Sequence, residues 1–244
     1  MSSEIAVIIL AAGKGKRMGS DIPKVLHKLK GTTLIERVIK TSRKLHCKKI
    51  ITVIGHQKEL VKQSLIEYKD VTFAIQNEQK GTAHAVKMCF ENLENFDGNV
   101  LILSGDVPLI SSKTLEKLIK AKESTGAKAS VLTADIDDPI GYGRIIRNSS
   151  GSLNQIKEHK DCNQEQLLIN EINAGIYVIE SKSLFEYIPK IGNQNAQGEY
   201  YLPDLINLLV LDNFSVELHK TEQIIEISGV NSQEQLRELE LYSK

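Results

Sequence analysis

The sequence predicts an α/β fold with a Rossmann-like, mainly parallel sheet, helices on both faces and a smaller mixed α+β portion. Apolar runs rich in β-branched residues, which predict buried strands, recur along the first part of the chain with helix-periodic segments between them. This alternation is typical of β-α-β units, whose strands lie parallel and whose helices cover the sheet. The predicted strands are 5–10, 50–54, 71–75, 100–103 and 129–134.

The helices between these strands are predicted from apolar residues at helical spacing. One begins behind Thr32 and Thr33, which are good helix caps. The same spacing recurs in 59–65, 83–90 and 115–121. Ligands of such sheets bind at the carboxyl ends of the strands, so we expect the functional site at that edge.

After Pro139 the pattern changes to shorter segments separated by turn glycines, which predicts the mixed α+β portion. A final helix is predicted near Asn231, with Glu234 three residues later as a capping-box partner. No internal repeat or linker interrupts the chain, so we expect one domain. Its portions are predicted to be 1–135, 136–230 and the C-terminal helix 231–244.

Composition excludes several classes of protein. The 244 residues include 31 Lys plus Arg and 31 Asp plus Glu, so no overall field attracts nucleic acid or an anionic membrane. The three cysteines lack metal-ligand spacing and predict ordinary reduced thiols. The apolar run 5–10 follows Glu4 and is too short for a signal peptide or a membrane span. We expect a cytoplasmic protein with small-molecule partners and no nucleic-acid or membrane partner.

A glycine-rich, cationic turn at 10–19 directly follows the first predicted strand. A dinucleotide fingerprint requires glycine where Met18 stands, and the P-loop pattern also fails, so both of these sites are disfavoured. Backbone N–H groups together with Lys14, Arg17 and Lys24 can instead cradle a triphosphate. From the turn alone, a solvated basic loop is an equally good interpretation.

Further motifs carry a specific resemblance. The turn and the following Pro23-Lys24 resemble the L-A-A-G-x-G-x-R-M…P-K signature of sugar-nucleotide pyrophosphorylases. The remaining motifs are similar to the N-terminal uridyltransferase domain of the bifunctional enzymes that make UDP-N-acetylglucosamine. They occur in that family's order and span nearly the whole chain, at 76–85, 105–109, 141–145, 158–161, 171–175, 195–201 and 229–231.

The resemblance implies a fold of the nucleotide-diphospho-sugar transferase type and transfer of a uridylyl group from UTP to N-acetylglucosamine 1-phosphate, with Mg²⁺ as cofactor and release of pyrophosphate. It makes 1–135 the nucleotide-binding portion and 136–230 the sugar-binding portion. The residues that we expect to bind the nucleotide are Leu10, Ala11, Ala12, Gly13, Lys24, Gln76, Gly81, Thr82 and Asp106. Those expected to bind the sugar are Gly143, Glu158, Asn173 and Asn231. Asp106 and Asn231 are expected to bind the metal, and Arg17 and Lys24 are expected to be catalytic.

The chemistry of Asp106 supports a metal-binding role, whereas Asn231 has a structural alternative. Asp106 follows a predicted strand, and its carboxylate is a hard oxygen ligand of the kind Mg²⁺ prefers. The resemblance supplies Asn231 as the second ligand, although asparagine at a helix start is commonly a cap. Asn231 can bind metal only if another acceptor caps the helix.

Three further residues have structural alternatives. The carboxamide of Gln76 can both donate to a pyrimidine carbonyl and accept from its N3–H, and so can read uracil. Thr82 opens a helix and can simply cap it. Glu158 beside His159 and Lys160 can equally belong to a surface charge cluster. The histidines, His84 included, show no metal spacing, and the reaction needs no base, so we expect structural roles for them.

Two departures from the family pattern keep other functions open. Ser104 stands where relatives commonly have Tyr, and Lys16 where Thr is common. The alternatives are a nucleotidyltransferase for another sugar 1-phosphate or for dTTP or CTP, and a non-catalytic nucleotide-sugar sensor. The sequence given ends at Lys244, without the β-helix acetyltransferase domain of bifunctional relatives, so we expect no acetylation by that route and leave the oligomeric state open.

Overall fold

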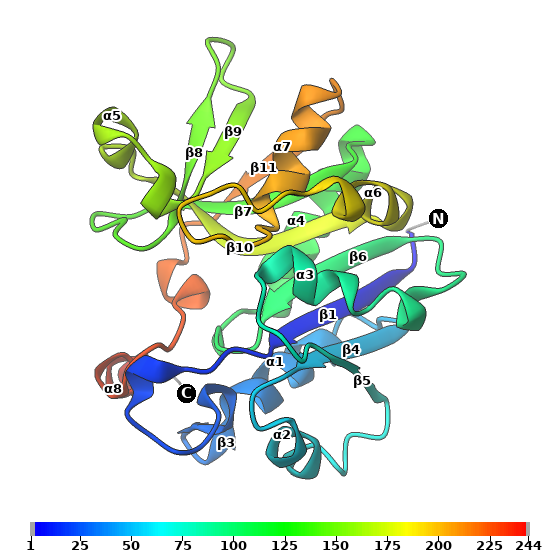
Figure 1. Ribbon diagram of the computed structural model, residues 1–244, viewed down its shortest axis with the longest axis vertical. Helices are drawn as coiled ribbons and strands as arrows, with labels where there is room; N and C mark the ends of the chain where they lie inside the picture. The colour runs from blue at the N-terminus through cyan, green and yellow to red at the C-terminus, as the bar shows by residue number, and fades with distance from the viewer. Residues whose placement is uncertain (1–2, 243–244) are drawn as a thin grey trace.

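The computed structural model of the protein describes residues 3–242, apart from the side chain of Lys16, so Lys244 lies outside the described residues. The chain folds around a nine-stranded mixed sheet, seven strands of which follow the order β11-β7-β10-β6-β1-β4-β5 (Figure 1). The strands are β1 (Ile5–Ala11), β4 (Lys49–Ile54), β5 (Val71–Ile75), β6 (Asn99–Ser104), β7 (Ala129–Asp135), β8 (Gly143–Arg147), β9 (Leu153–Lys157), β10 (Glu171–Glu180) and β11 (Val216–Lys220), with β2 (Lys28–Leu29) and β3 (Thr32–Thr33) in a separate ribbon.

The mainly parallel sheet predicted from the sequence is confirmed. β1 pairs in parallel with β4 and β6, β4 with β5, and β7 with β11. The exception is β10, which lies antiparallel between β6 and β7. β10 follows residue 135 in the sequence but lies in the same sheet as the strands before that residue. The division of the chain at residues 135 and 230 therefore stays a prediction about function.

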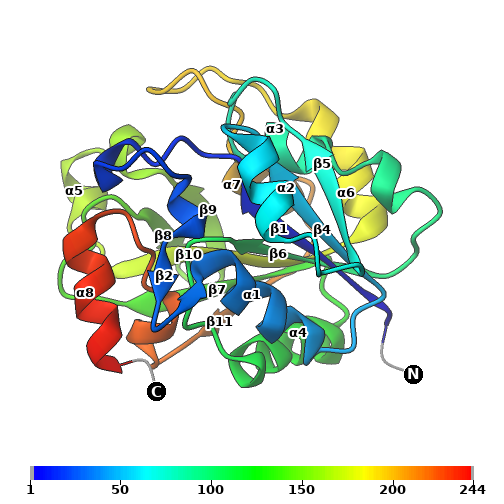
Figure 2. The ribbon, with the colours of Figure 1, turned by 90° about the horizontal axis from the view of Figure 1, so that it is seen from below.

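Two apolar layers cover the sheet because side chains alternate along its strands. Ala6 and Ile8 of β1 face the layer formed with α3, α6 and α7, whereas Val7 and Ile9 face the layer formed with α1, α2 and α4. Figure 2 shows α1 and α4 on one side of the sheet and α6 on the other. No helix within residues 3–242 is long and apolar enough to cross a membrane. The helices are α1 (Leu34–Arg43), α2 (Lys58–Ser64), α3 (Thr82–Lys87), α4 (Ser112–Thr125), α5 (Gln164–Leu167), α6 (Ser181–Tyr187), α7 (Pro203–Leu211) and α8 (Gln233–Tyr242).

Helix caps follow local hydrogen-bonding chemistry. Thr33 caps α1 through a reciprocal pair of bonds with Glu36, as its sequence predicts. The predicted cap of α8, Asn231 paired with Glu234, is wrong. Ser232 Oγ accepts from the backbone N–H of Gln235 at 3.2 Å, and the Gln235 carboxamide oxygen accepts from the backbone N–H of Asn231 at 2.7 Å. The carboxamide of Asn231 is therefore free for another use.

Candidate active site

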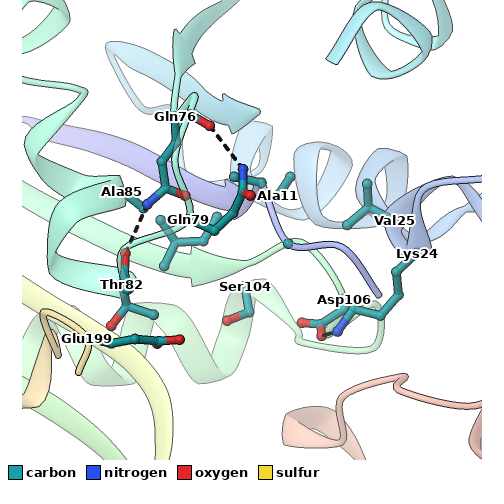
Figure 3. Close-up of a pocket in the computed structure, with 14 residues that line it drawn as sticks. Ala11, Lys24, Val25, Gln76, Gln79, Thr82, Ala85, Ser104, Asp106 and Glu199 are labelled. Carbon is teal, nitrogen blue, oxygen red and sulfur yellow. Dashed lines mark hydrogen bonds and ion pairs between the residues drawn. The ribbon is translucent and has the colours of Figure 1, made fainter. Parts of the chain in front are cut away.

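A cavity of about 310 Å³ opens at the carboxyl ends of the parallel strands, between the segments that follow β1, β5 and β6 (Figure 3). Such an edge is where α/β sheets hold ligands. The cavity contains every residue that the sequence assigns to nucleotide binding, although their roles stay predictions. It is lined by Leu10, Ala11, Ala12, Gly13, Lys24, Val25, Gln76, Gln79, Gly81, Thr82, Ala85, Ser104, Asp106 and Glu199.

The glycine-rich turn after β1 places Lys24 at the end of this cavity. Gly15 has φ 57°, and a Cβ on it would lie 2.7 Å from the Cβ of Lys24. Only glycine fits this conformation and this close contact without strain. The turn therefore packs against the 3₁₀ turn Lys24–Leu26, from which the Lys24 side chain extends towards Asp106.

Two polar side chains from distant parts of the chain meet at Lys24. Its ammonium group donates to Asp106 Oδ2 and, at 3.0 Å, to Asn231 Oδ1. The backbone N–H of Val230 donates to the Asp106 carbonyl at 2.9 Å, which fixes the segment before α8 beside the loop after β6. The Lys24 and Asp106 side chains are only 16% and 18% exposed, so their attraction is less screened than at an open surface.

This cluster fits the expected ligand chemistry of a hard divalent cation. A carboxylate oxygen and a carboxamide oxygen converge on one cation, which here is the Lys24 ammonium group. Mg²⁺ often takes one or two protein oxygens and completes its shell with phosphate and water. Accordingly, the cluster needs no set of three or more acidic, His or Cys ligands, and among the described residues there is none.

Arg17 does not join this cluster. It lies on the 3₁₀ turn Lys16–Met18, its side chain is exposed, and it lines neither of the cavities at this edge. Four residues are expected from the sequence to be catalytic or to bind the metal: Arg17, Lys24, Asp106 and Asn231. The structure brings together the last three of them. The catalytic role of Arg17 stays a prediction, which requires the turn at 10–19 to close over a bound triphosphate.

Gln76 and Gly81 form the opposite end of the cavity. Gln76 is 3% exposed, and its Nε2 donates to the Gly81 carbonyl and contacts His84 Nδ1, each at 3.0 Å. With both amide hydrogens engaged, Gln76 keeps only its carbonyl oxygen for a ligand. The predicted donation to a pyrimidine carbonyl is therefore not available, whereas acceptance from an N–H is.

The start of α3 is held by the segment 199–202 rather than by a side-chain cap. Thr82 is the first residue of the helix, and its hydroxyl accepts from the backbone N–H of Leu202 at 2.9 Å, so the capping interpretation of Thr82 is wrong. Gly81 has φ 111°, and a Cβ on it would lie 2.4 Å from the carbonyl oxygen of Tyr200. Gly81 thus allows this segment to lie directly against the cavity wall.

A second cavity of about 180 Å³ adjoins the first and shares Leu10, Thr82 and Ser104 with it. Ser104, where relatives commonly have Tyr, therefore lies at the junction between the two. Except for Asn231, which contacts Lys24, the residues predicted to bind sugar line this second cavity. Its lining is completed by Gly141, Tyr142, Gly143, Glu158, Asn173, Ala174, Gly175, Tyr177, Leu202 and Pro203.

Strand pairing explains why Gly143, Glu158 and Asn173 lie together. Gly143 of β8 pairs with Asn173 of β10, and β9 ends beside it at Lys157. A Cβ on Gly143 would lie 3.4 Å from Glu158 Oε1 and 3.5 Å from Asn173 Cβ. Because β10 runs antiparallel to β6, it begins at the edge where the parallel strands end, so these residues face the same site as Asp106.

The polar groups of the second cavity have distinct environments. Burial raises the pKa of Glu158 to about 7, with smaller contributions from Asp161, Asp204 and Glu199. Glu158 therefore does not belong to a surface charge cluster with His159 and Lys160, which was the alternative interpretation. Asn173 is buried, donates to the Tyr177 hydroxyl at 2.6 Å and accepts from the backbone N–H of Gly175 at 3.0 Å.

One structural residue at this site was missed from the sequence. Arg144 is 1% exposed, and its guanidinium donates to the carbonyl of Pro139 at 2.7 Å and to that of Tyr142. It thereby holds the loop that brings Gly141 and Tyr142 to the second cavity. An arginine directly before the apolar pair Ile145-Ile146 was the available signal, since buried arginine requires such partners.

The chain is similar over its whole length to known bifunctional proteins. The chain is 46% identical over 244 residues to the bifunctional protein GlmU of Bacillus cytotoxicus and 45% identical to that of Bacillus cereus. These matches cover all of this chain and 52% of each relative, so the chain spans about half the length of the curated relatives it matches.

A solved structure shares the fold. It is that of a Bacillus anthracis protein, assigned as a glucose-1-phosphate thymidylyltransferase and bound to sucrose. It superposes with a TM-score of 0.74 at 21% identity, covering 98% of this chain and 94% of that one. Residues 7–195 match the family described as MobA-like NTP transferase domain. This match covers well over half of the sequence, so the chain belongs to the MobA-like NTP transferase domain family.

Proposed function

We propose that this chain transfers a uridylyl group from UTP to N-acetylglucosamine 1-phosphate, giving UDP-N-acetylglucosamine and pyrophosphate. The observation that carries the proposal is the pair of adjoining cavities at one sheet edge, which share Leu10, Thr82 and Ser104. One has the Lys24 ammonium group paired with Asp106 at one end and the Gln76 carboxamide at the other, which suits a nucleoside triphosphate. The other has carboxyl and carboxamide groups, which suit an amino-sugar. The similarity to the GlmU proteins supports the same pair of substrates.

The reaction requires neither a protein nucleophile nor a base. A phosphate oxygen of the sugar 1-phosphate attacks the α-phosphorus of UTP, a new P–O bond forms, and the bond to pyrophosphate breaks. The attacking phosphate is already ionised at neutral pH. The chain must bring two polyanions together and neutralise charge at the reacting phosphorus. Lys24 at the junction of the loops fits this role, and Arg17 is proposed to assist from the turn.

Asp106 and Asn231 are proposed to hold Mg²⁺, since their oxygens already converge on one cation. When bound, this ion would neutralise charge on the phosphate oxygens of the nucleotide. The chain's own contribution is to present two hard oxygens and to keep Lys24 within reach of them. These oxygens come from segments that a backbone hydrogen bond joins, which keeps their separation fixed.

The second cavity is proposed to recognise the sugar. Glu158 is only partly ionised near neutral pH, because its pKa is raised to about 7, so its carboxyl group can both accept from and donate to sugar hydroxyls. Asn173 is fixed by Tyr177 and Gly175 and is proposed to contact the N-acetyl group. Gly143 offers its backbone beside both.

One experiment tests the proposal directly. The purified chain is offered UTP, dTTP, CTP and GTP, each against a panel of sugar 1-phosphates with Mg²⁺, and pyrophosphate release is measured. We expect the highest kcat/KM for UTP with N-acetylglucosamine 1-phosphate. A different preferred pair would refute the proposed substrates. Tight nucleotide-sugar binding without turnover of any pair would identify a sensor.

A further inference from the structure

The carboxamide of Gln76 is held in one orientation. Its Nε2 lies 3.0 Å from the Gly81 carbonyl oxygen and 3.0 Å from His84 Nδ1. A carbonyl oxygen can only accept, so the nitrogen and not the oxygen of the amide must face Gly81. The second amide hydrogen is then directed at His84. The carbonyl oxygen of Gln76, a residue that lines the first cavity, is the group left for a ligand.

This arrangement defines the state of His84. Because Gln76 donates to Nδ1, that nitrogen must carry a lone pair, and the ring must be neutral with its hydrogen on Nε2. His84 lies on α3, directly behind the residues that line the nucleotide cavity, and it does not line that cavity itself. It therefore contacts no ligand there and acts through Gln76.

We propose that His84 is a positioning residue for base recognition: its neutral Nδ1 holds the Gln76 amide so that only the carbonyl oxygen faces the nucleotide. The inference rests on the proposed function and deepens it. An acceptor at this position selects a base whose facing ring nitrogen carries a hydrogen, as N3 of uracil does. Cytosine presents a lone pair at N3, which the Gln76 carbonyl repels.

Protonation of His84 makes its contact with the Gln76 amide repulsive. A hydrogen on Nδ1 would oppose the amide hydrogens of Gln76, and the amide cannot turn over without directing its oxygen at the Gly81 carbonyl. Protons can reach the ring from a separate cavity of about 350 Å³, which His84 lines together with Lys80, Lys87 and Tyr200. UTP affinity is therefore expected to fall as the pH drops through the pKa of His84.

The charged and titratable groups around His84 keep it neutral near pH 7. Burial lowers its pKa from 6.5, and Lys80 and Lys87 lower it further, whereas the Glu78 carboxylate and a hydrogen bond with the Glu78 backbone raise it. The Tyr200 ring centroid lies 6.5 Å from that of His84. The loss of UTP affinity is thus expected on the acidic side of about pH 6.5.

The test compares His84→Ala, His84→Asn and Lys87→Ala. Lys87→Ala leaves the His84–Gln76 contact in place, so it should keep wild-type UTP affinity at alkaline pH. Because Lys87 lowers the pKa of His84, the acidic fall in affinity should move to higher pH in this variant. Dissociation constants for UTP and CTP are measured by calorimetry at mildly acidic and mildly alkaline pH. Thermal denaturation checks folding. Loss of one ordinary hydrogen bond predicts about tenfold weaker UTP binding for His84→Ala, with a smaller UTP-to-CTP ratio. In His84→Asn the side-chain oxygen can accept in place of Nδ1, so UTP binding is expected to recover without the acidic fall.

The outcomes separate this inference from the proposed function. Wild-type protein that prefers UTP, together with a His84→Ala variant of unchanged UTP affinity and UTP-to-CTP ratio, overturns the inference alone. A lower melting temperature with an unchanged ratio also overturns it, since that is a purely structural role. Wild-type protein that binds no pyrimidine nucleotide overturns both. Nitrogen NMR of His84 gives an independent check, because a hydrogen on Nδ1 at neutral pH contradicts the proposed contact.

Discussion

Replacing Glu158 by glutamine is expected to stabilise the fold at alkaline pH. The carboxyl group lies in the second cavity, where burial and the neighbouring Asp161, Asp204 and Glu199 raise its pKa from 4.5 to about 7. A carboxyl group with a higher pKa in the folded protein than in the unfolded chain holds its proton more tightly when folded. Its ionisation therefore destabilises the fold progressively as the pH rises from 4.5 through about 7.

The size of this effect follows from the two pKa values. A pKa raised from 4.5 to about 7 corresponds to a loss of about 3.4 kcal/mol of unfolding free energy, which is complete only above the folded-state pKa. At about pH 5 the penalty is about 0.8 kcal/mol, so the change between about pH 5 and about pH 8.5 is at most about 2.5 kcal/mol. The side chain keeps part of its surface in contact with solvent, and screening reduces this to about 1–2 kcal/mol.

Urea denaturation of the wild type and of Glu158→Gln measures the difference at both pH values. The variant is expected to unfold at a higher urea concentration than the wild type, with a larger advantage at alkaline than at acidic pH. Glu238→Gln, an exposed replacement on α8, is the matched control and should show no such dependence. An advantage that is equal at the two pH values, or that is larger at acidic pH, would refute the assignment of a raised pKa to Glu158.

Two further predictions concern the first cavity. Replacing Lys24 by methionine frees Asp106 from its ammonium partner, so the nucleotide-free protein should bind Mn²⁺ more tightly in electron paramagnetic resonance titrations, while turnover falls about a hundredfold or more. The same replacement at exposed Lys14 is the control and should leave metal binding unchanged. Unaltered Mn²⁺ affinity in the Lys24 variant would contradict a cation position shared by Lys24 and the metal. Gly81→Ala should lower the unfolding free energy by at least about 2 kcal/mol in urea titrations. The Cβ of the alanine would meet the Tyr200 backbone, and the φ of this position disfavours a side chain. A variant as stable as the wild type would contradict that packing.

Much of the fold is local in origin and could be predicted. The apolar runs at 5–10, 50–54, 71–75, 100–103 and 129–134 correspond to strands that differ from them by at most one residue at either end. Burial on both faces makes such runs continuously apolar, and the helices between them show their periodicity independently. Local patterns do not encode which strands become neighbours. The insertion of β10 between β6 and β7 was therefore not predicted.

The predictions about the site failed where the outcome depends on competition between similar residues. Asn231 and Ser232 are both good caps; in the structure Asn231 contacts Lys24, and Ser232 caps the helix. The donors of Gln76 were expected to be free, but α3 supplies His84 as an acceptor. In each case the deciding partner lies on another segment, which sequence spacing alone cannot reveal.

A third, small apolar cluster joins the glycine-rich turn to helix α8. Met18 of the glycine-rich turn packs together with Leu236 and Leu239 of α8. Helix α8 follows directly on Asn231, so one set of apolar contacts fixes both the turn proposed to hold phosphate and a proposed metal ligand. Neither element belongs to the main sheet. The contacts of this cluster therefore act together with the sheet, which carries Asp106 after β6, in forming this end of the cavity.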